Sequence, residues 1–178
     1  MDNLEKVTLG GGCFWCLEAV YNRIIGVSSV RSGYSGGAEV NPSWEQVCSG
    51  STKHVEVCEI VFDSSLICLD DLLLVFWEIH DPTTFNRQGH DVGSHYRSVI
   101  FCEKRTDLAI AEKSKSLAQL NFSNPIVSEI AIRNNFYSAG EFHDSYFELN
   151  RSQPYCQFVV SPKVDKLNKR FKDLLKNK

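Results

Sequence analysis

No run of about 18 apolar residues occurs in this 178-residue chain, so no membrane-spanning helix is expected. The formal net charge is only −3, which provides no general attraction to nucleic acid or to an anionic membrane. The acidic start, MDNLEKVTLG, lacks the apolar segment of a secretory signal. Seven cysteines, an odd number, fit reduced thiols better than a secreted disulfide scaffold. We therefore expect a cytoplasmic protein.

Low-complexity linkers and repeats of solenoid length are also missing from the sequence. The hydrophobic fraction of 43% and charged fraction of 23% are ordinary for a globular protein, and the length suits one core. We therefore expect a single domain that spans residues 1–178.

Hydrophobic periodicity predicts alternating strands and helices. The predicted strands are residues 5–11, 26–37, 54–63, 96–102 and 125–132, with a late extended segment at 155–160. The predicted helices are residues 14–24, 65–81, 106–121 and 140–150, with a helix or frayed tail after 163. The leading order β-α-β-β-α-β predicts an α+β fold, a ferredoxin-like two-layer sandwich with extra C-terminal elements. Two long loops remain, residues 34–53 and 81–96, and loops of that length are usually functional.

The stretch GGGCFWC places Cys13 between the first strand and the first helix. Glycines allow a tight turn there, and the free N–H groups and dipole of a helix start favour a thiolate. Cys16 lies one turn further on, so the pair is suited to a redox disulfide. The same spacing is also half of a zinc site, but no second cysteine pair has ligand spacing. Phe14 and Trp15 suit either the core or an apolar pocket.

The two loops add polar groups that could serve a reactive thiol. Residues 34–53 contain Tyr34 and Glu45, and residues 81–96 contain Asp91 and Tyr96. Each of these residues taken alone is more often structural than catalytic.

Together, the motifs resemble the peptide methionine sulfoxide reductases of the A type, which reduce the S epimer of the sulfoxide. The matching stretches run from about residue 7 to 165 and include GGGCFW, GVSSVRSGYSGG, NPSWEQVCSG, HDPTTFNRQGHDVGSHYRS and NRSQPYCQFVVSPKV. The resemblance implies that Cys13 is the nucleophile and that Phe14 and Trp15 hold the substrate's S-methyl group. It implies Glu45 as the acid, Tyr34 and Tyr96 as hydroxyls that bind the sulfoxide oxygen, and Asp91 as a polar neighbour.

The implied reaction leaves Cys13 as a sulfenic acid, which a second cysteine converts to a disulfide. A thioredoxin-like dithiol then reduces that disulfide, with free or protein-bound methionine sulfoxide as substrate and no metal or organic cofactor. We expect a monomer. A general thiol–disulfide oxidoreductase is the alternative function, and a binding module with an inactive site is a third.

The chain departs from the family pattern at two places. Many relatives have glycine where this chain has Cys16, and many read G-H-A-E where it has Lys53-His54-Val55-Glu56. We therefore expect a structural role for His54. We favour Cys16 as the resolving thiol over Cys156, which lies where some relatives carry theirs, and a relay through both is also open.

Overall fold

The computed structural model describes residues 3–176, which form a mixed α+β fold around a mostly antiparallel sheet. The six strands of this sheet lie in the order β7-β6-β1-β3-β2-β8, and only the β6–β7 pair is parallel. In chain order they are β1 (Leu4–Gly10), β2 (Val27–Ser35), β3 (Val55–Asp63), β6 (Val99–Cys102), β7 (Glu129–Ile132) and β8 (Tyr137–Ser138). A separate hairpin joins β4 (Arg87–Gln88) to β5 (Asp91–Val92).

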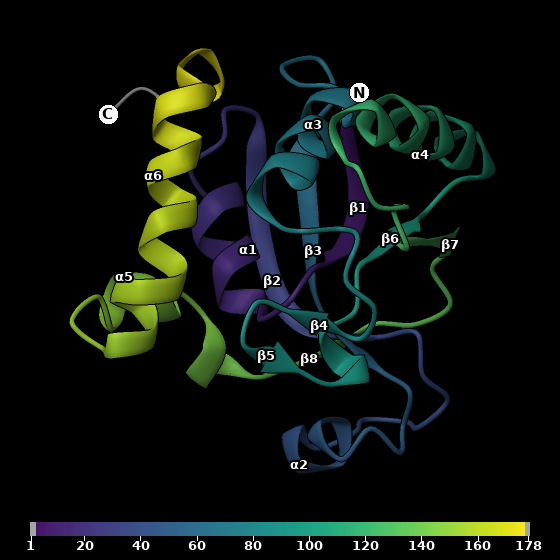
Figure 1. Ribbon diagram of the computed structural model, residues 1–178, viewed down its shortest axis with the longest axis vertical. Coiled ribbons are helices and arrows are strands. Elements are labelled where there is room, and N and C mark those ends of the chain that lie inside the picture. The colour runs from purple at the N-terminus through teal and green to yellow at the C-terminus, as the bar shows by residue number, and fades with distance from the viewer. Residues whose placement is uncertain (1–2, 177–178) are drawn as a thin grey trace.

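The helices lie mainly along the sheet and beside one another (Figure 1). They are α1 (Phe14–Tyr21), α2 (Trp44–Cys48), α3 (Leu69–Ile79), α4 (Arg105–Ala118), α5 (Tyr146–Leu149) and α6 (Ser161–Arg170). Helix α1 packs on β2 and β3, and α6 packs against α1 and α3. The start of α1 lies at the same end of the molecule as α2 and the β4–β5 hairpin, so this end collects the long loops (Figure 1).

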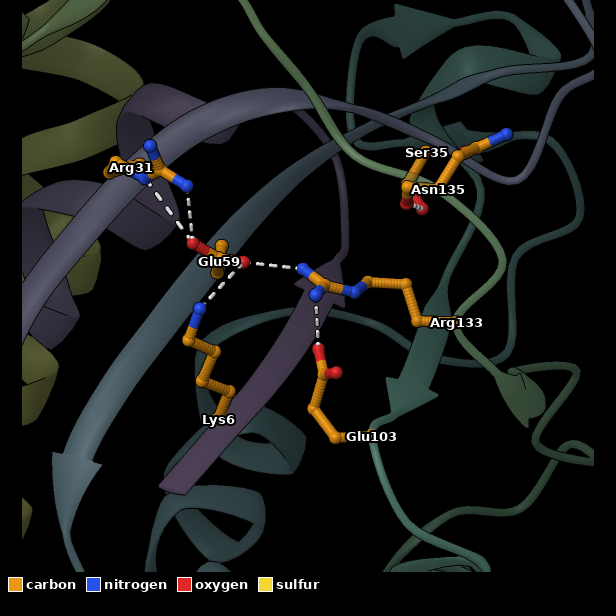
Figure 2. Close-up of polar contacts among 7 residues, drawn as sticks. All are labelled: Lys6, Arg31, Ser35, Glu59, Glu103, Arg133 and Asn135. Atoms are coloured by element: carbon orange, nitrogen blue, oxygen red, sulfur yellow. Dashed lines mark hydrogen bonds and ion pairs between the residues drawn. The ribbon is translucent and has the colours of Figure 1, made fainter. Parts of the chain in front are cut away.

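Strand β3 separates two different surfaces because its side chains alternate between the faces of the sheet. Cys58 lies on the helix-covered face, where its thiol donates to the Phe14 carbonyl at 3.3 Å. Glu59 lies on the opposite face, where Arg31 (2.7 Å), Lys6 (3.7 Å) and Arg133 pair with its carboxylate (Figure 2). Apolar side chains of β3 are buried under the helices, and the charge of Glu59 is paired on the other face. Together these two requirements fix which face of the strand points to the helices.

Most predicted elements are present, with shorter bounds, but the segment predicted as extended at 155–160 is wrong. Residues Cys156–Val160 form one turn of π-helix that continues into α6. The predicted helix at 140–150 is divided into a 3₁₀ turn and α5, because Ser145 takes a left-handed conformation with φ 54°. In the second predicted loop, β4, β5 and a 3₁₀ turn give residues 87–96 a defined shape.

None of the helices within residues 3–176 combines the length and the hydrophobicity that a bilayer crossing requires.

Candidate active site

Cys13 lies at the junction where β1 gives way to α1, as the glycine-rich motif predicted. Gly12 has φ +88°, a conformation that glycine adopts without strain, and its N–H donates to the Tyr96 carbonyl at 3.1 Å. Cys13 is the N-cap of α1 in extended conformation. The turn therefore joins the first helix directly to the loop that carries Tyr96.

A cavity of about 530 Å³ opens at this junction. Its lining comes from residues far apart in the chain: Cys13, Phe14, Trp15, Trp44, Glu56, Asp91, Tyr96, Phe142, His143, Tyr146 and Tyr155. One thiol, two carboxyls and a wall of aromatic rings thus share one concave surface, which is the usual composition of a small-ligand site.

The cavity buries Cys13, which is only 7% exposed. Burial raises the pKa of its thiol well above the usual value, and the carboxyl of Glu56 and the thiol of Cys16 raise it further. The Trp15 N–H and the Tyr155 hydroxyl act in the opposite direction by hydrogen bonding to the sulfur. The helix-start donor predicted from sequence is therefore present, but desolvation outweighs it in the ligand-free site.

Glu56 is the carboxyl that faces the Cys13 sulfur. It lies on β3 directly opposite Tyr34 of β2, and its Oε2 accepts the Phe14 N–H at 3.2 Å. The side chain is 2% exposed. Burial raises its pKa to about 8, against the lowering effect of the Phe14 N–H, so the carboxyl is protonated at neutral pH.

Glu45, the residue predicted as the acid, is not among the residues that line this cavity. It lies on the exposed first turn of α2, where hydrogen bonds with its own backbone N–H and with Ser43 lower the pKa of the carboxyl. The free N–H groups of a helix start stabilise a carboxylate. The structure therefore does not support Glu45 as the acid that protonates the sulfoxide oxygen.

The aromatic wall is built around Trp15. Its indole stacks on the Tyr146 ring at 3.6 Å between centroids, and its Nε1 donates to His143 Nδ1 at 3.2 Å. Burial lowers the pKa of His143, which favours the neutral imidazole that can accept this bond. Phe14 packs against His143 with centroids 5.0 Å apart. Two rings from a segment more than 120 residues away thus hold both predicted pocket residues.

The remaining polar residues predicted from the loops also gather around Cys13. Within residues 3–176, the buried hydroxyl of Tyr34 has no hydrogen-bond partner. Tyr96 lines the cavity, and burial followed by the charge of Glu56 raises the pKa of both tyrosines. Asp91 accepts the Tyr155 hydroxyl at 2.6 Å. The two tyrosines therefore keep their protons and offer donors around the thiol.

Cys16 and Cys156 differ in their relation to Cys13. The Tyr155 hydroxyl lowers the pKa of the Cys13 thiol and also that of the Cys16 thiol. Cys156 is 0% exposed in the apolar core and is not among the residues that line the cavity. Only the first pair therefore has a hydroxyl neighbour in common.

Sequence reasoning missed Glu56, His143, Tyr146 and Tyr155. A glutamate inside the apolar strand HVEVCEIVF was the available signal for Glu56, because a charge on a buried strand needs a reason. His143, Tyr146 and Tyr155 come from the C-terminal third, and no local pattern connects them to Cys13.

His54 has the structural role expected of it, since Nδ1 accepts the Gly37 N–H at 3.1 Å and Nε2 lies 2.8 Å from the Glu39 carbonyl. Among residues 3–176, no group of three or more His, Cys, Asp or Glu side chains is arranged to hold a metal ion.

Comparison with known proteins identifies the family. The sequence model of the family described as "Peptide methionine sulfoxide reductase" matches residues 5–175. The chain belongs to the peptide methionine sulfoxide reductase family.

Curated relatives support the A type. The peptide methionine sulfoxide reductase MsrA of Leptospira borgpetersenii is 49% identical over 92% of this chain and 93% of its own. The MsrA of Saccharolobus solfataricus is 47% identical over 97% and 98% of the two chains. Both therefore match along nearly their whole length.

Solved structures agree. Reduced Mxr1 of Saccharomyces cerevisiae superposes with a TM-score of 0.80 at 35% identity, covering 86% of this chain and 89% of its own. Methionine sulfoxide reductase A of Corynebacterium diphtheriae superposes with a TM-score of 0.78 at 29% identity, covering 85% and 77%. The chain is an oxidoreductase that reduces methionine sulfoxide with thiols, and the alternative of a general thiol–disulfide oxidoreductase is not favoured.

Proposed function

We propose that Cys13 attacks the sulfur of methionine S-sulfoxide while Glu56 protonates the departing oxygen. The observation that carries this assignment is a thiol and a protonated, buried carboxyl in one aromatic cavity. A sulfoxide oxygen leaves sulfur only when it is protonated, and a carboxyl with a pKa of about 8 holds a proton at neutral pH. The bond between Cys13 Sγ and the methionine sulfur then breaks, methionine leaves with its electron pair, and the protonated oxygen is transferred to Cys13 Sγ. Thiol and sulfoxide thus yield a sulfenic acid and methionine.

Tyr34 and Tyr96 hold the sulfoxide oxygen in this proposal. Their raised pKa values keep both hydroxyls as donors, and the Tyr34 hydroxyl has no other partner within residues 3–176. Donors fixed in a dry cavity stabilise charge that develops on oxygen. Asp91 acts indirectly, because it accepts the hydroxyl of Tyr155, which lowers the pKa of the Cys13 thiol.

Selectivity for the S epimer follows because three chemically different groups surround the sulfoxide sulfur. The S-methyl group lies against Phe14 and Trp15, the oxygen lies at Glu56, and the thiol approaches the remaining side. The sulfur is a stereocentre, so the other epimer cannot satisfy all three contacts at once.

Cys16 resolves the sulfenic acid in this proposal, because it shares the Tyr155 hydroxyl with Cys13, whereas Cys156 is enclosed in the core. The disulfide is then reduced by a thioredoxin-like dithiol. A structure titled as Mxr1 from Saccharomyces cerevisiae in complex with Trx2 supports this partner, at a TM-score of 0.57 and 28% identity over 80% of this chain and 84% of that one. The cycle needs no metal or organic cofactor.

We also propose that the sheet and its helices form a ferredoxin-like core. The antiparallel order β6-β1-β3-β2, with helices between β1 and β2 and between β3 and β6, supports a ferredoxin-like core. We propose that residues 1–178 form a single domain and that the protein acts in the cytoplasm.

The deciding experiment is turnover on resolved R and S sulfoxides of a methionyl peptide with dithiothreitol as reductant. We expect methionine only from the S epimer, and none from Cys13→Ser, because a hydroxyl is far less ionised and less nucleophilic than a thiol. Comparable rates on both epimers, or near-normal turnover by Cys13→Ser, would remove the proposal.

A further inference from the structure

His80 lies against the glycine turn of the site, and the proposed reaction gives it no part. It is the C-cap residue of α3, in extended conformation, and is 7% exposed. Its Nδ1 lies 2.6 Å from the Phe76 carbonyl of the same helix, and its Nε2 lies 2.8 Å from the Ser98 hydroxyl. The second of these hydrogen bonds joins residues 18 positions apart in the chain.

The Phe76 carbonyl fixes the direction of both hydrogen bonds. A carbonyl only accepts, so Nδ1 of His80 carries the proton, and Nε2 accepts from Ser98. Burial lowers the pKa of His80 to about 3, so the imidazole stays neutral at neutral pH and keeps this tautomer. The Ser98 oxygen then accepts from Ser128, whose hydroxyl lies 2.6 Å away. Both nitrogens of the imidazole are thus committed to a partner.

The His80–Ser98 hydrogen bond closes the base of the loop 81–97. This loop carries Asp91 and Tyr96, which both line the catalytic cavity. Fixing the two ends of a loop removes conformational freedom from the residues between them. The bond therefore restricts where the Tyr96 hydroxyl can lie.

The glycine turn that presents the nucleophile packs against the same residues. A Cβ added at Gly11 would lie 3.0 Å from His80 Cδ2, and one added at Gly12 would lie 2.8 Å from Cβ of Gln88 in the loop. The Gly12 N–H donates to the Tyr96 carbonyl at 3.1 Å. The turn therefore lies directly against the imidazole and against the loop whose base the imidazole closes.

We infer that His80 is a positioning residue for the first half-reaction, acting through its hydrogen bond to Ser98 to hold the loop of Tyr96 against the turn of Cys13. This inference rests on the proposed roles of Cys13 and Tyr96. His80 is not among the residues that line the catalytic cavity, so it acts through these two segments. The nucleophile and the hydroxyl come from different parts of the chain, and a misplacement of about 1 Å can cost about 10²-fold in rate.

The test removes the hydrogen bond and leaves the imidazole in place. For Ser98→Ala, we expect single-turnover methionine formation at saturating methionine S-sulfoxide to fall by about 10- to 100-fold. The sulfoxide concentration that gives half the maximal rate should change by less than about twofold, because the aromatic wall is untouched. A merely structural role would leave the maximal rate of the folded enzyme unchanged.

Amide exchange provides a second measurement on the same variant. The Gly12 N–H should exchange faster in Ser98→Ala, relative to the amides of β1 and β3, because the Tyr96 carbonyl that accepts it is held less firmly. Global destabilisation would instead speed the exchange of the strand amides as well.

Two control variants remove buried serine hydroxyls without removing the His80–Ser98 bond. Ser128→Ala takes away only the donor to the Ser98 oxygen, and Ser114→Ala takes away the acceptor of Trp77 Nε1 at 2.8 Å. Both should form methionine within about threefold of wild type. Urea unfolding of the three variants shows that each rate belongs to folded enzyme.

The inference is overturned if Ser98→Ala forms methionine within about threefold of wild type, or if Ser128→Ala and Ser114→Ala lose as much rate as Ser98→Ala. Unchanged Gly12 exchange in Ser98→Ala would equally show that the turn does not depend on this bond.

A second variant keeps the test decisive if Ser98→Ala does not fold. His80→Asn retains an amide that can donate to the Phe76 carbonyl but is too short to reach Ser98, and it should show the same loss of rate. The proposed roles themselves fail separately, if Cys13→Ser turns over or if Tyr96→Phe forms methionine at the wild-type rate.

Discussion

At the scale of single residues, Glu56 and Glu45 form a natural comparison because they are the same side chain in opposite environments. Glu56→Gln cannot donate a proton to the sulfoxide oxygen, so we expect single-turnover methionine formation to fall by about 10²–10⁴, the usual contribution of a general acid. Glu45→Gln is the matched control and should change the rate by less than about threefold, since its carboxyl is exposed on α2. The reverse result would return the role of acid to Glu45.

The raised pKa of Glu56 affects how the rate of methionine formation depends on pH. Only the protonated carboxyl donates, and burial raises its pKa to about 8. Burial also raises the pKa of the Cys13 thiol, so the thiolate fraction still grows in this range. We therefore expect wild-type methionine formation to rise with pH and to level off above about 8, and Glu56→Gln to keep rising. Single-turnover rates between pH 6 and 10 provide the measurement. A wild-type rate that keeps rising through this range, as in Glu56→Gln, would contradict a buried acid.

The residues that were predictable are those that share a local motif with the nucleophile. Cys13, Phe14 and Trp15 are adjacent, so their spacing alone placed them together. Glu56 reaches the site through strand register, opposite Tyr34 on β2, and register is set by tertiary pairing. The position of Tyr155 in the site depends on where a C-terminal turn packs, and the residues next to Tyr155 in the sequence do not specify that packing.

At the scale of elements, Glu18 connects α1 to α5. It is 2% exposed, and its Oε1 accepts the Ser145 N–H at 2.7 Å, with the Tyr146 N–H also bonding the carboxylate. Burial raises the pKa of this carboxyl, and the two N–H bonds oppose that rise. Helix α5 thus has its cap supplied by another helix, and α5 carries the Tyr146 ring that stacks on Trp15.

Removing this cap should loosen the aromatic wall more than it disturbs the thiol. For Glu18→Ala we expect a loss of about 1 kcal/mol in unfolding free energy, typical of an N-cap. We also expect a raised KM with a smaller change in kcat, and faster amide exchange in residues 141–149. Glu141→Ala, an exposed residue of the same segment, is the control. Unchanged exchange in Glu18→Ala would show that α5 holds its place by packing alone.

The same end of the chain shows where element prediction fails. Residues 155–160 are rich in β-branched and aromatic side chains and were predicted as extended, yet they form a π-turn that runs into α6. Cys156 and Val160 are both buried there, so helical spacing directs two apolar side chains into the core. Packing against α1 outweighs an intrinsic strand preference, which is a weak determinant by comparison.

At the scale of the whole molecule, the charge network on the open face of the sheet joins three strands and a distant loop. Glu59 of β3 pairs with Lys6 of β1, Arg31 of β2 and Arg133, and Arg133 also pairs with Glu103 at 2.6 Å (Figure 2). Burial raises the pKa of Glu59, but the bonds from Arg133 and Arg31 outweigh it and the pKa is lowered overall.

Because the pKa of Glu59 is lowered in the folded state, the contribution of its ion pairs to the free energy of unfolding depends on pH. It is complete above the usual glutamate pKa and is lost as the pH falls through the lowered pKa of Glu59. For Glu59→Gln we expect a loss of about 1–3 kcal/mol at pH 7, the range for hydrogen bonds to charged groups, and a gap that closes toward pH 3. Urea unfolding at several pH values measures it. Glu103→Gln, which removes one partner at the edge, should lose less, and a gap that widened in acid would contradict the network.

The last prediction concerns which sulfur meets the external reductant. In the dithiol structure, Cys13 lines the cavity, whereas Cys16 is 0% exposed and lies on α1, which packs against α6. We therefore expect a thioredoxin thiolate to attack Cys13 Sγ, so that the S–S bond breaks and Cys16 leaves as a thiolate. Thiol–disulfide exchange depends on which sulfur the attacking thiolate can reach, so access favours attack on Cys13. A thioredoxin with its second active-site cysteine replaced by serine should trap a mixed disulfide at Cys13, which peptide mapping can locate. The Cys156→Ser enzyme should give the same mixed disulfide. A mixed disulfide at Cys16 would mean that the helix pair opens before reduction, and that burial in the resting structure does not govern recycling.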